Sequence, residues 1–177
     1  HEQGSLIDLT GSGAAIASSF LPGYDPTNAF DKYTTEWRSA ELGEDITGKA
    51  YIGYDFGPIR LENGRLRYSI ETYVKKDVTR IKIKQNCTAN RVTKARLERS
   101  NDGEVWYGAA IVQIPDCDGL VTISVRKSVP SRWWRLRPIT FNGTSNDYWS
   151  VQAIQMMDYE ETNIYNIQDR IFLENRD

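Results

Sequence analysis

The chain has 177 residues, 40% of them hydrophobic, and its 22 Lys and Arg against 24 Asp and Glu give a formal net charge of −2. This length suits one domain with a single hydrophobic core. A net charge near zero supplies no overall basic field to attract nucleic acid, and the apolar runs are far shorter than the roughly 20 residues of a membrane-spanning helix.

Strand-like segments follow one another along the chain, in short runs bounded by Pro, Gly, Asp or Asn. Segment 80–84 alternates basic residues with isoleucine, the period of a strand with one buried face. The turn sequence Ser100-Asn101-Asp102-Gly103 predicts a hairpin. The same reasoning predicts strands at 51–56, 65–70, 96–99, 109–114, 120–125, 133–136 and 151–157. Short strands at about ten-residue spacing predict an antiparallel sandwich or barrel.

The C-terminal segment 159–177 has a different pattern. Ile164, Ile167 and Ile171 recur at spacings of three and four, which predicts an amphipathic helix. One interpretation is a helix that packs on its own sandwich. The other is a connector to a neighbouring domain or subunit, which the charged end without a capping glycine favours. The chain begins at His1 with no methionine and no signal-like segment, so we expect a processed chain or part of a longer protein.

The sequence lacks the residues that histidine-based or zinc-based catalysis needs. His1 is the only histidine and stands at the chain end, so a Ser-His-Asp or Cys-His centre has no base. Two cysteines and one histidine cannot form a four-ligand zinc site alone. No phosphate-binding glycine loop appears. The sequence therefore predicts that the protein is not an enzyme. A glycoside hydrolase with two carboxylates stays an alternative, because a sequence does not give their separation.

Four segments carry a family likeness. They are ASSFLPGYDPTNAFD at 17–31 followed by TEWRS at 35–39, YIGYDFG at 51–57, SNDGEVW at 100–106, and RWWRLRP at 132–138 with YWSVQAI at 148–154. In this order they resemble the discoidin domain, the C-terminal module of coagulation factors V and VIII, which is related to galactose-binding-like carbohydrate-binding modules. The resemblance implies an all-β antiparallel jelly-roll sandwich over residues 6–158, eight strands in the family, with 159–177 as an extension.

Loop 21–26 is the first candidate for ligand contact. Two prolines stiffen it, and Tyr24 offers a flat surface with a polar tip. The resemblance implies that this loop and region 32–46 project toward ligand. The predicted ligand-binding residues are Tyr24, Asp25, Tyr33 and Arg38.

The direction of Arg38 follows from its neighbour. Trp37 is expected in the core, so in an extended segment Arg38 points outward. The alternative is a solvated loop in which Arg38 pairs with a carboxylate such as Glu41 or Glu44.

A structural calcium ion is a further implication of the resemblance. The family's calcium loop has Asp-Gly and Thr-x-Trp, with a glutamate from the closing strand. Asp31 and Thr35 are the predicted metal ligands, but Lys32 stands where the family has glycine. The closing strand has Ala153 at the glutamate position and Gln155 two residues later. Calcium prefers six to eight oxygen ligands, so this loss leaves the calcium site open as an alternative.

Other residues support two interpretations each. Trp37, Trp106 and Trp133 are expected in the core, with sugar stacking as the alternative, and only one of Trp133 and Trp134 can face inward. Cys87 and Cys117 form either a disulfide or two free thiols. The basic residues of 75–99 indicate either a solvated sheet face or a surface for an anionic glycan or phospholipid.

These patterns together predict a non-catalytic recognition module that binds a cell-surface carbohydrate or a similar surface ligand. We expect it to belong to a larger extracellular or virion protein and to contact a neighbouring domain or subunit through 159–177. The alternative is a structural assembly domain, as in a phage tail or baseplate, which packs on protein neighbours.

Overall fold

The computed structural model describes residues 3–10, 13–31, 35–57, 75–86, 89–115 and 119–161, with the backbone alone described at 3–5 and 159–161. Four subjects of the sequence predictions lie outside these ranges: the strand at 65–70, Tyr33, the two cysteines, and the isoleucine pattern of the C-terminal segment. Within the described residues, no helix has the length and apolar character of a membrane span.

The described elements are ten strands and two short helices. In chain order they are β1 (Gln3–Asp8), β2 (Ala14–Ala17), the 3₁₀ helix η1 (Pro26–Phe30), β3 (Trp37–Leu42), α1 (Asp45–Lys49), β4 (Ile52–Asp55), β5 (Arg80–Gln85), β6 (Arg91–Ser100), β7 (Tyr107–Gln113), β8 (Val121–Ser124), β9 (Trp133–Asn142) and β10 (Tyr148–Glu161).

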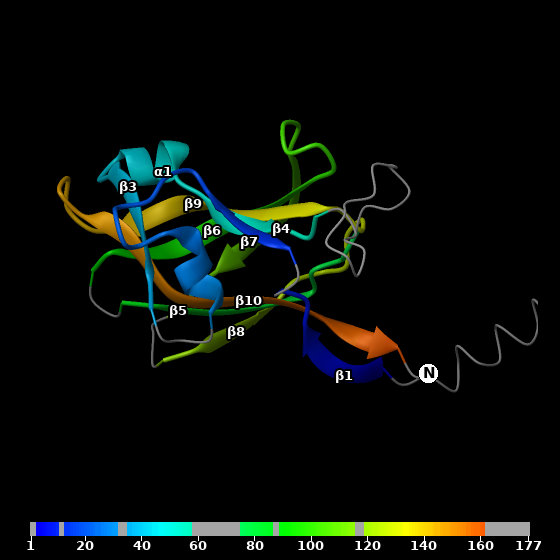
Figure 1. Cartoon of the computed structure of the whole chain (residues 1–177). Helices are drawn as coiled ribbons and strands as arrows, with labels where there is room; N and C mark the ends of the chain where they lie inside the picture. The colour runs from blue at the N-terminus through cyan, green and yellow to red at the C-terminus, as the bar shows by residue number, and fades with distance from the viewer. Residues whose placement is uncertain are drawn as a thin grey trace, which may run out of the picture.

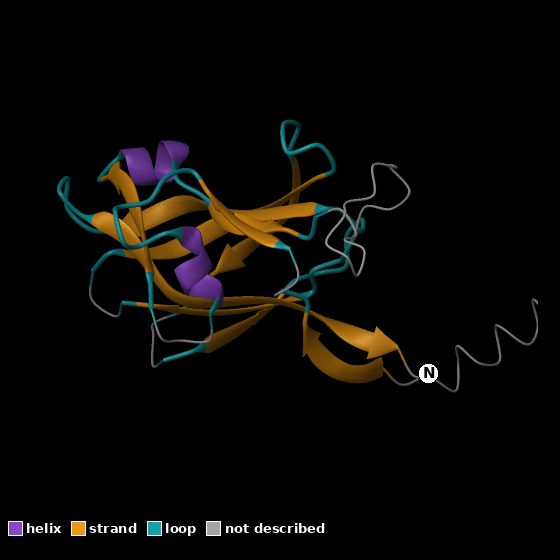
Figure 2. Ribbon diagram, viewed as in Figure 1, coloured by secondary structure: helices purple, strands orange, loops and turns teal. Residues whose placement is uncertain are grey.

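The strands form two antiparallel five-stranded sheets that face each other (Figures 1 and 2). Sheet A has the order β1-β10-β5-β8, and β3 also pairs with β10. Sheet B has the order β2-β4-β9-β6-β7. Strand β10 is long enough to pair with β3 along its first half and with β1 along its second half. The predicted antiparallel β-sandwich is confirmed.

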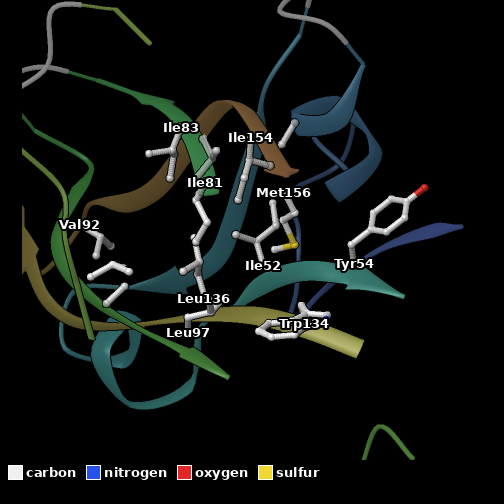
Figure 3. Packing of buried hydrophobic residues seen from close by; sticks show 14 of the residues in the cluster. Ile52, Tyr54, Ile81, Ile83, Val92, Leu97, Trp134, Leu136, Ile154 and Met156 are labelled. Carbon is white, nitrogen blue, oxygen red and sulfur yellow. The ribbon is translucent and has the colours of Figure 1, made fainter. Parts of the chain in front are cut away.

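The core lies between the sheets, as the alternation of the sequence predicts. Ile81 and Ile83 of β5 are fully buried, while the basic residues that alternate with them along the strand are half-exposed. Figure 3 shows these two side chains from sheet A facing Leu97 and Leu136 of sheet B. Trp37 and Trp149 meet edge to face, with ring centroids 5.0 Å apart. Aromatic pairs of this geometry contribute beyond the area they bury.

The tryptophan predictions are correct for Trp37 and wrong for Trp106 and Trp133. Trp37 is buried, but on β9 it is Trp134 that points into the core, and Trp133 is half-buried on the outer side. The physical reason is register. Trp134 pairs with buried Tyr54, which fixes the alternation of the whole strand. Trp106 is half-buried and stacks on Arg135, whose guanidinium carbon lies 3.9 Å from the ring centroid.

The predicted hairpin forms between β6 and β7. Asp102 Oδ1 accepts hydrogen bonds from the backbone N–H of Glu104 and Val105, both at 2.9 Å. Gly103 has a φ of +76°, a conformation that a residue with a side chain rarely adopts. The sequence signal was reliable here because the turn is held by contacts within its own residues.

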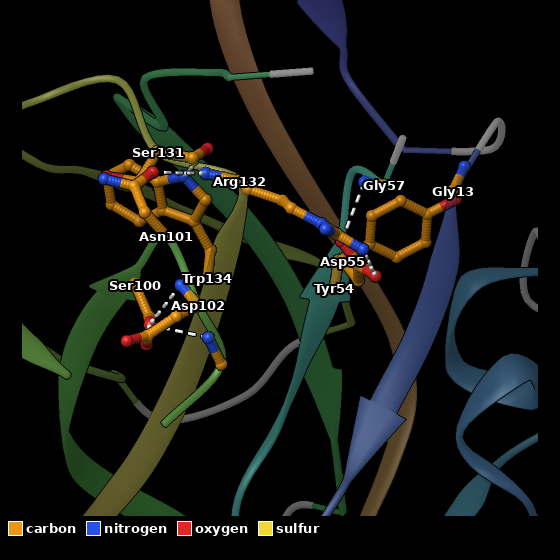
Figure 4. Close-up of polar contacts among 11 residues, drawn as sticks. Gly13, Tyr54, Asp55, Gly57, Ser100, Asn101, Asp102, Ser131, Arg132 and Trp134 are labelled. Atoms are coloured by element: carbon orange, nitrogen blue, oxygen red, sulfur yellow. Dashed lines mark hydrogen bonds and ion pairs between the residues drawn. The ribbon is translucent and has the colours of Figure 1, made fainter. Parts of the chain in front are cut away.

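A polar network ties strand ends at one end of the sandwich (Figure 4). Arg132 donates from Nε to Asp55 Oδ1 at 2.8 Å and from Nη2 to Oδ2 at 3.1 Å. Asp55 Oδ1 also accepts from the backbone N–H of Gly57 at 2.7 Å, and Asn101 Oδ1 accepts from the N–H of Arg132 at 3.3 Å. This two-point ion pair joins the end of β4 to the approach to β9.

Candidate functional site

Loop 21–26 is attached to the edge of sheet A by its own backbone. The N–H of Tyr24 donates to Leu21 O at 2.9 Å, which closes a turn around Gly23, whose φ is +85°. The N–H of Leu21 donates to Arg38 O at 3.0 Å, and the N–H of Arg38 donates to Tyr24 O at 3.3 Å. These bonds continue the backbone pairing of β3 into the loop, so the backbone at Tyr24 is restrained.

Asp25 fixes the exit of the loop. Its Oδ1 accepts a hydrogen bond from the N–H of Thr27 at 2.8 Å, and Pro26 opens helix η1 directly after it. This is an N-cap, in which a carboxylate satisfies a backbone donor that the helix leaves free. The structure therefore gives the Asp25 carboxylate a structural role in shaping the loop.

Arg38 is stacked beside Tyr24. Its guanidinium carbon lies 4.0 Å from the centroid of the Tyr24 ring and 4.8 Å from that of Tyr148. Arg38 Nη2 also donates to Glu36 Oε1 at 2.9 Å. The outward direction predicted for Arg38 is confirmed, and its carboxylate partner is Glu36 rather than Glu41 or Glu44. Stacking between a cation and aromatic rings orients both, so Arg38 positions Tyr24.

The electrostatics of Glu36 and Arg38 favour the charged pair. Burial raises the pKa of Glu36, but the hydrogen bonds from Arg38 and Ser150, together with the Arg38 charge, outweigh it and leave the pKa below its usual value. Ser150 Oγ donates to the second carboxylate oxygen, Oε2. The hydrogen bond to Glu36 raises the pKa of Arg38. Both groups are therefore ionised at neutral pH.

An open pocket of about 310 Å³ lies next to this stack. Its lining residues are Gly23, Tyr24, Asn28, Thr35, Glu36, Lys84 and Gln152. We call it the Tyr24 pocket. One wall comes from the loop and helix η1, and the other comes from β5 and β10 of sheet A. Segments from four parts of the chain thus meet at one polar surface.

Lys84 of β5 lines the pocket together with Gln152, which stands at a bulge in β10. Val151 pairs with Gln85, whereas Ala153 pairs with Lys84, so Gln152 is an extra residue on its strand. The Gln152 amide nitrogen donates to Asn86 Oδ1 at 3.0 Å. The sequence did not predict that these two residues line the pocket, because Lys84 was one basic residue among several and no local pattern marks a bulge.

The pocket combines a tyrosine ring with varied hydrogen-bonding groups. Lys84 carries a donor, and the Gln152 side chain carries both a donor and an acceptor. Asn28, which also lines the pocket, holds two parts of its wall together, since its Nδ2 donates to Gly23 O and to Glu36 O, both at 3.1 Å. In the lining described here Glu36 is the single carboxylate, whereas glycoside hydrolysis uses two. The surface is suited to holding a polyhydroxylated ligand.

The two side chains predicted to bind calcium, those of Asp31 and Thr35, contact each other. Thr35 Oγ1 donates to Asp31 Oδ2 at 2.6 Å, so the two predicted ligands bond to each other. Ala153 is buried and brings no oxygen from its side chain. Among the described residues, no three His, Cys, Asp or Glu side chains gather closely enough to hold a metal ion. Calcium also accepts backbone carbonyl oxygens as ligands, so the calcium site stays a prediction.

The sequence matches no protein-family model and no curated protein. Solved structures do match. Chitosan-binding module 1 of a chitosanase/glucanase from Paenibacillus sp. IK-5 has 21% identity and a TM-score of 0.60, covering 86% of this chain and 98% of that chain.

Two modules from Clostridium perfringens are similar as well. CBM32-3 of a family 31 glycoside hydrolase has 20% identity and a TM-score of 0.62, covering 88% of this chain and 95% of its own. The family 32 module of NanJ, in complex with galactose, has 14% identity and a TM-score of 0.59, covering 83% and 94%. The chain therefore has the discoidin or galactose-binding-like jelly-roll fold that these carbohydrate-binding modules share.

Proposed function

We propose that this protein is a non-catalytic carbohydrate-binding module. It recognises a cell-surface glycan as part of a larger extracellular or virion-borne protein, and the Tyr24 pocket receives the sugar. The observation that carries the proposal is the pocket itself, in which a fixed tyrosine ring stands beside Lys84 and Gln152.

The chemistry of the lining suits a sugar ring. A pyranose has an apolar face that stacks on an aromatic ring and hydroxyl groups that both donate and accept hydrogen bonds. The pocket volume of about 310 Å³ is at the lower end for small-ligand sites, which suits one or two sugar residues. Because the loop is already attached to β3, little conformational entropy is lost on binding.

The similar structures support the class of ligand. One is a chitosan-binding module, and another holds galactose. These names belong to proteins at most 21% identical to this chain, so they support carbohydrate binding without indicating which sugar is bound here. Which sugar binds here depends on the residues that line this pocket, where Lys84 adds a positive charge.

A glycan array followed by calorimetry tests the proposal. We expect binding to at least one glycan and a loss of about 10- to 100-fold in affinity for Tyr24→Ala, as for an aromatic residue at the centre of a site. Tyr107→Ala is the matched control, because Tyr107 is an exposed tyrosine on β7 of the other sheet. A blank array with neutral and acidic glycans would overturn the proposal in favour of the assembly role. Equal affinity of the two variants would remove the Tyr24 pocket as the site.

A further inference from the structure

A second pocket lies on the outer face of sheet B, away from Tyr24. It has a volume of about 320 Å³ and is lined by Thr47, Arg96, Arg137, Pro138 and Ile139. We call it the arginine pocket. It exists because β4 pairs with β9 only as far as Leu136, and helix α1 lies beside β9 beyond that point. Arg137 Nη2 donates to Gly48 O of α1 at 3.2 Å, which fixes this guanidinium.

The two arginines are direct neighbours across the sheet. Arg96 of β6 pairs with Arg137 of β9. Their sequence neighbours Leu97 and Leu136 are buried, so both arginine side chains point outward on the same face. Residues opposite each other on antiparallel strands have Cα atoms about 4.5 to 5.5 Å apart, and like charges in this position are destabilising.

In the part of the chain that the structure describes, no carboxylate forms an ion pair with either arginine. Glu98 lies two residues along the same face, but it pairs with Arg135 at 2.8 Å. Asp45 of α1 pairs with Lys49 at 3.8 Å. Neither Arg96 nor Arg137 forms an ion pair among the described residues. Two adjacent cations are therefore left available in one recess.

We propose that the arginine pocket binds an oxyanion, the carboxylate or sulfate of an acidic sugar, as a second glycan contact. Guanidinium groups donate in a planar fork that matches the oxygens of such anions, and two of them can hold one group from both sides. The Thr47 hydroxyl lines the same recess. Exposed Ile139 on β9, and Ile111, which pairs with Arg96 from β7, offer apolar contacts for the sugar ring.

This inference extends the proposed function, because it takes a glycan as the carrier of the anion. The test is calorimetry on the full chain with three probes: a heparin-derived sulfated hexasaccharide, an oligogalacturonate of the same length, and inorganic sulfate. The variants are Arg96→Gln, Arg137→Gln and their double substitution. Arg126→Gln is the control, since Arg126 is an exposed arginine outside both pockets and loses the same charge.

We expect at least one acidic oligosaccharide to bind in a salt-dependent way, and each pocket variant to lose about tenfold in affinity. Arg126→Gln should bind like the unmodified chain. Melting temperatures of the pocket variants should be unchanged or higher, because a like-charge contact is removed. If Arg126→Gln lost as much affinity as the pocket variants, the loss would come from the change in net charge alone, and the proposal would be overturned. Inorganic sulfate binding as tightly as the oligosaccharides would also overturn it.

The two sites can fail separately. If neutral glycans bind with dependence on Tyr24 and no acidic oligosaccharide depends on Arg96 or Arg137, this inference fails and the proposed function stands. If acidic oligosaccharides depend on the two arginines while Tyr24→Ala changes nothing, the arginine pocket stands and the Tyr24 pocket fails. If no glycan of either kind binds, both are wrong.

Discussion

Arg38 shows how one residue organises the Tyr24 pocket without lining it. Its guanidinium lies beside the rings of Tyr24 and Tyr148 and bonds to Glu36, and its backbone pairs with the loop. In the proposed site, Arg38 would act on the ligand only through Tyr24. Its role is positioning.

Arg38→Ala should therefore lower glycan affinity by about 1 to 2 kcal/mol, the range for a lost charged hydrogen bond and stacking contact. Arg38→Lys should recover part of the affinity, because it keeps the charge but not the planar fork. Calorimetry measures the affinities, and circular dichroism checks that each variant is folded. Full affinity in Arg38→Ala would mean that the loop bonds alone hold Tyr24.

The contribution of the Glu36–Arg38 pair to the stability of the fold depends on pH. The pKa of Glu36 is lowered in the folded protein, so its stabilising contribution is complete above the unfolded value of about 4.3 and disappears as pH falls through the lower folded pKa. Glu36→Gln should cost about 1 to 2 kcal/mol at pH 7 and much less near pH 3. Urea unfolding at both pH values measures this, and an equal cost at both would contradict it.

The stability contribution of Asp77 should change with pH in the opposite direction. Burial raises its pKa, although the backbone hydrogen bond from Ser128 acts to lower it. A raised pKa means that the stability contribution is complete below the unfolded value of about 3.9 and is lost as pH rises through the folded pKa. Asp77→Asn should therefore equal or exceed the unmodified chain in stability at pH 7, since the amide oxygen can still accept from Ser128. A large loss of stability at pH 7 in the same urea assay would show that the Asp77 charge is needed.

At the scale of the elements, the pairing of β4 with β9 depends on Gly53. A Cβ added at Gly53 would lie 2.0 Å from Trp134 O and 2.6 Å from Arg135 Cα, both on the paired strand β9. Neither backbone atom can move without breaking the pairing. The glycine is required here by close approach of two strands.

Gly53→Ala should destabilise the domain by about 3 kcal/mol or more, because the clash involves backbone atoms in a buried sheet. Gly48→Ala is the matched control: no atom lies within 4 Å of the added Cβ, and alanine favours the helix α1 by up to about 1 kcal/mol. Thermal unfolding of both variants compares them. Equal melting temperatures would show that β4 and β9 can separate without cost.

For the whole molecule, the limits of the sandwich can be stated from its strands. Strand β10 continues to Glu161 and pairs with β1, whose first residue is Gln3 (Figure 1). The sheet thus extends three residues past Asp158, where the sequence reasoning ended the sandwich. The division of the chain at this point stays a prediction, as does the role of the segment that follows.

Deleting 162–177 should leave the melting temperature within about 2 °C and abolish a higher-order assembly, if this segment is a connector. The reason is its isoleucine pattern, which needs a partner surface to be stable. Calorimetry and sedimentation velocity measure the two effects. A monomer that melts many degrees lower would show instead that the segment belongs to the core of the sandwich.

The sequence by itself determined the fold class, the positions of several strands from residue 51 onward and the stiff loop with Tyr24. These follow from local rules: alternation places Ile81 and Ile83 inside, and Asn, Asp and Gly make the β6–β7 turn. Tyr24 and Arg38 could also be chosen as candidate site residues from the sequence, because a proline-rich loop and an outward position beside Trp37 are visible along the chain.

Only the tertiary structure decided what meets across the sheets. The register of β9 with β4 chose Trp134 over Trp133 for the core, and pairing between β6 and β9 brought Arg96 next to Arg137. A bulge in β10 placed Gln152 with Lys84 beside Tyr24. Such contacts join residues far apart in the chain, and a shift of one residue in register would reverse each of them, so no local pattern could predict them.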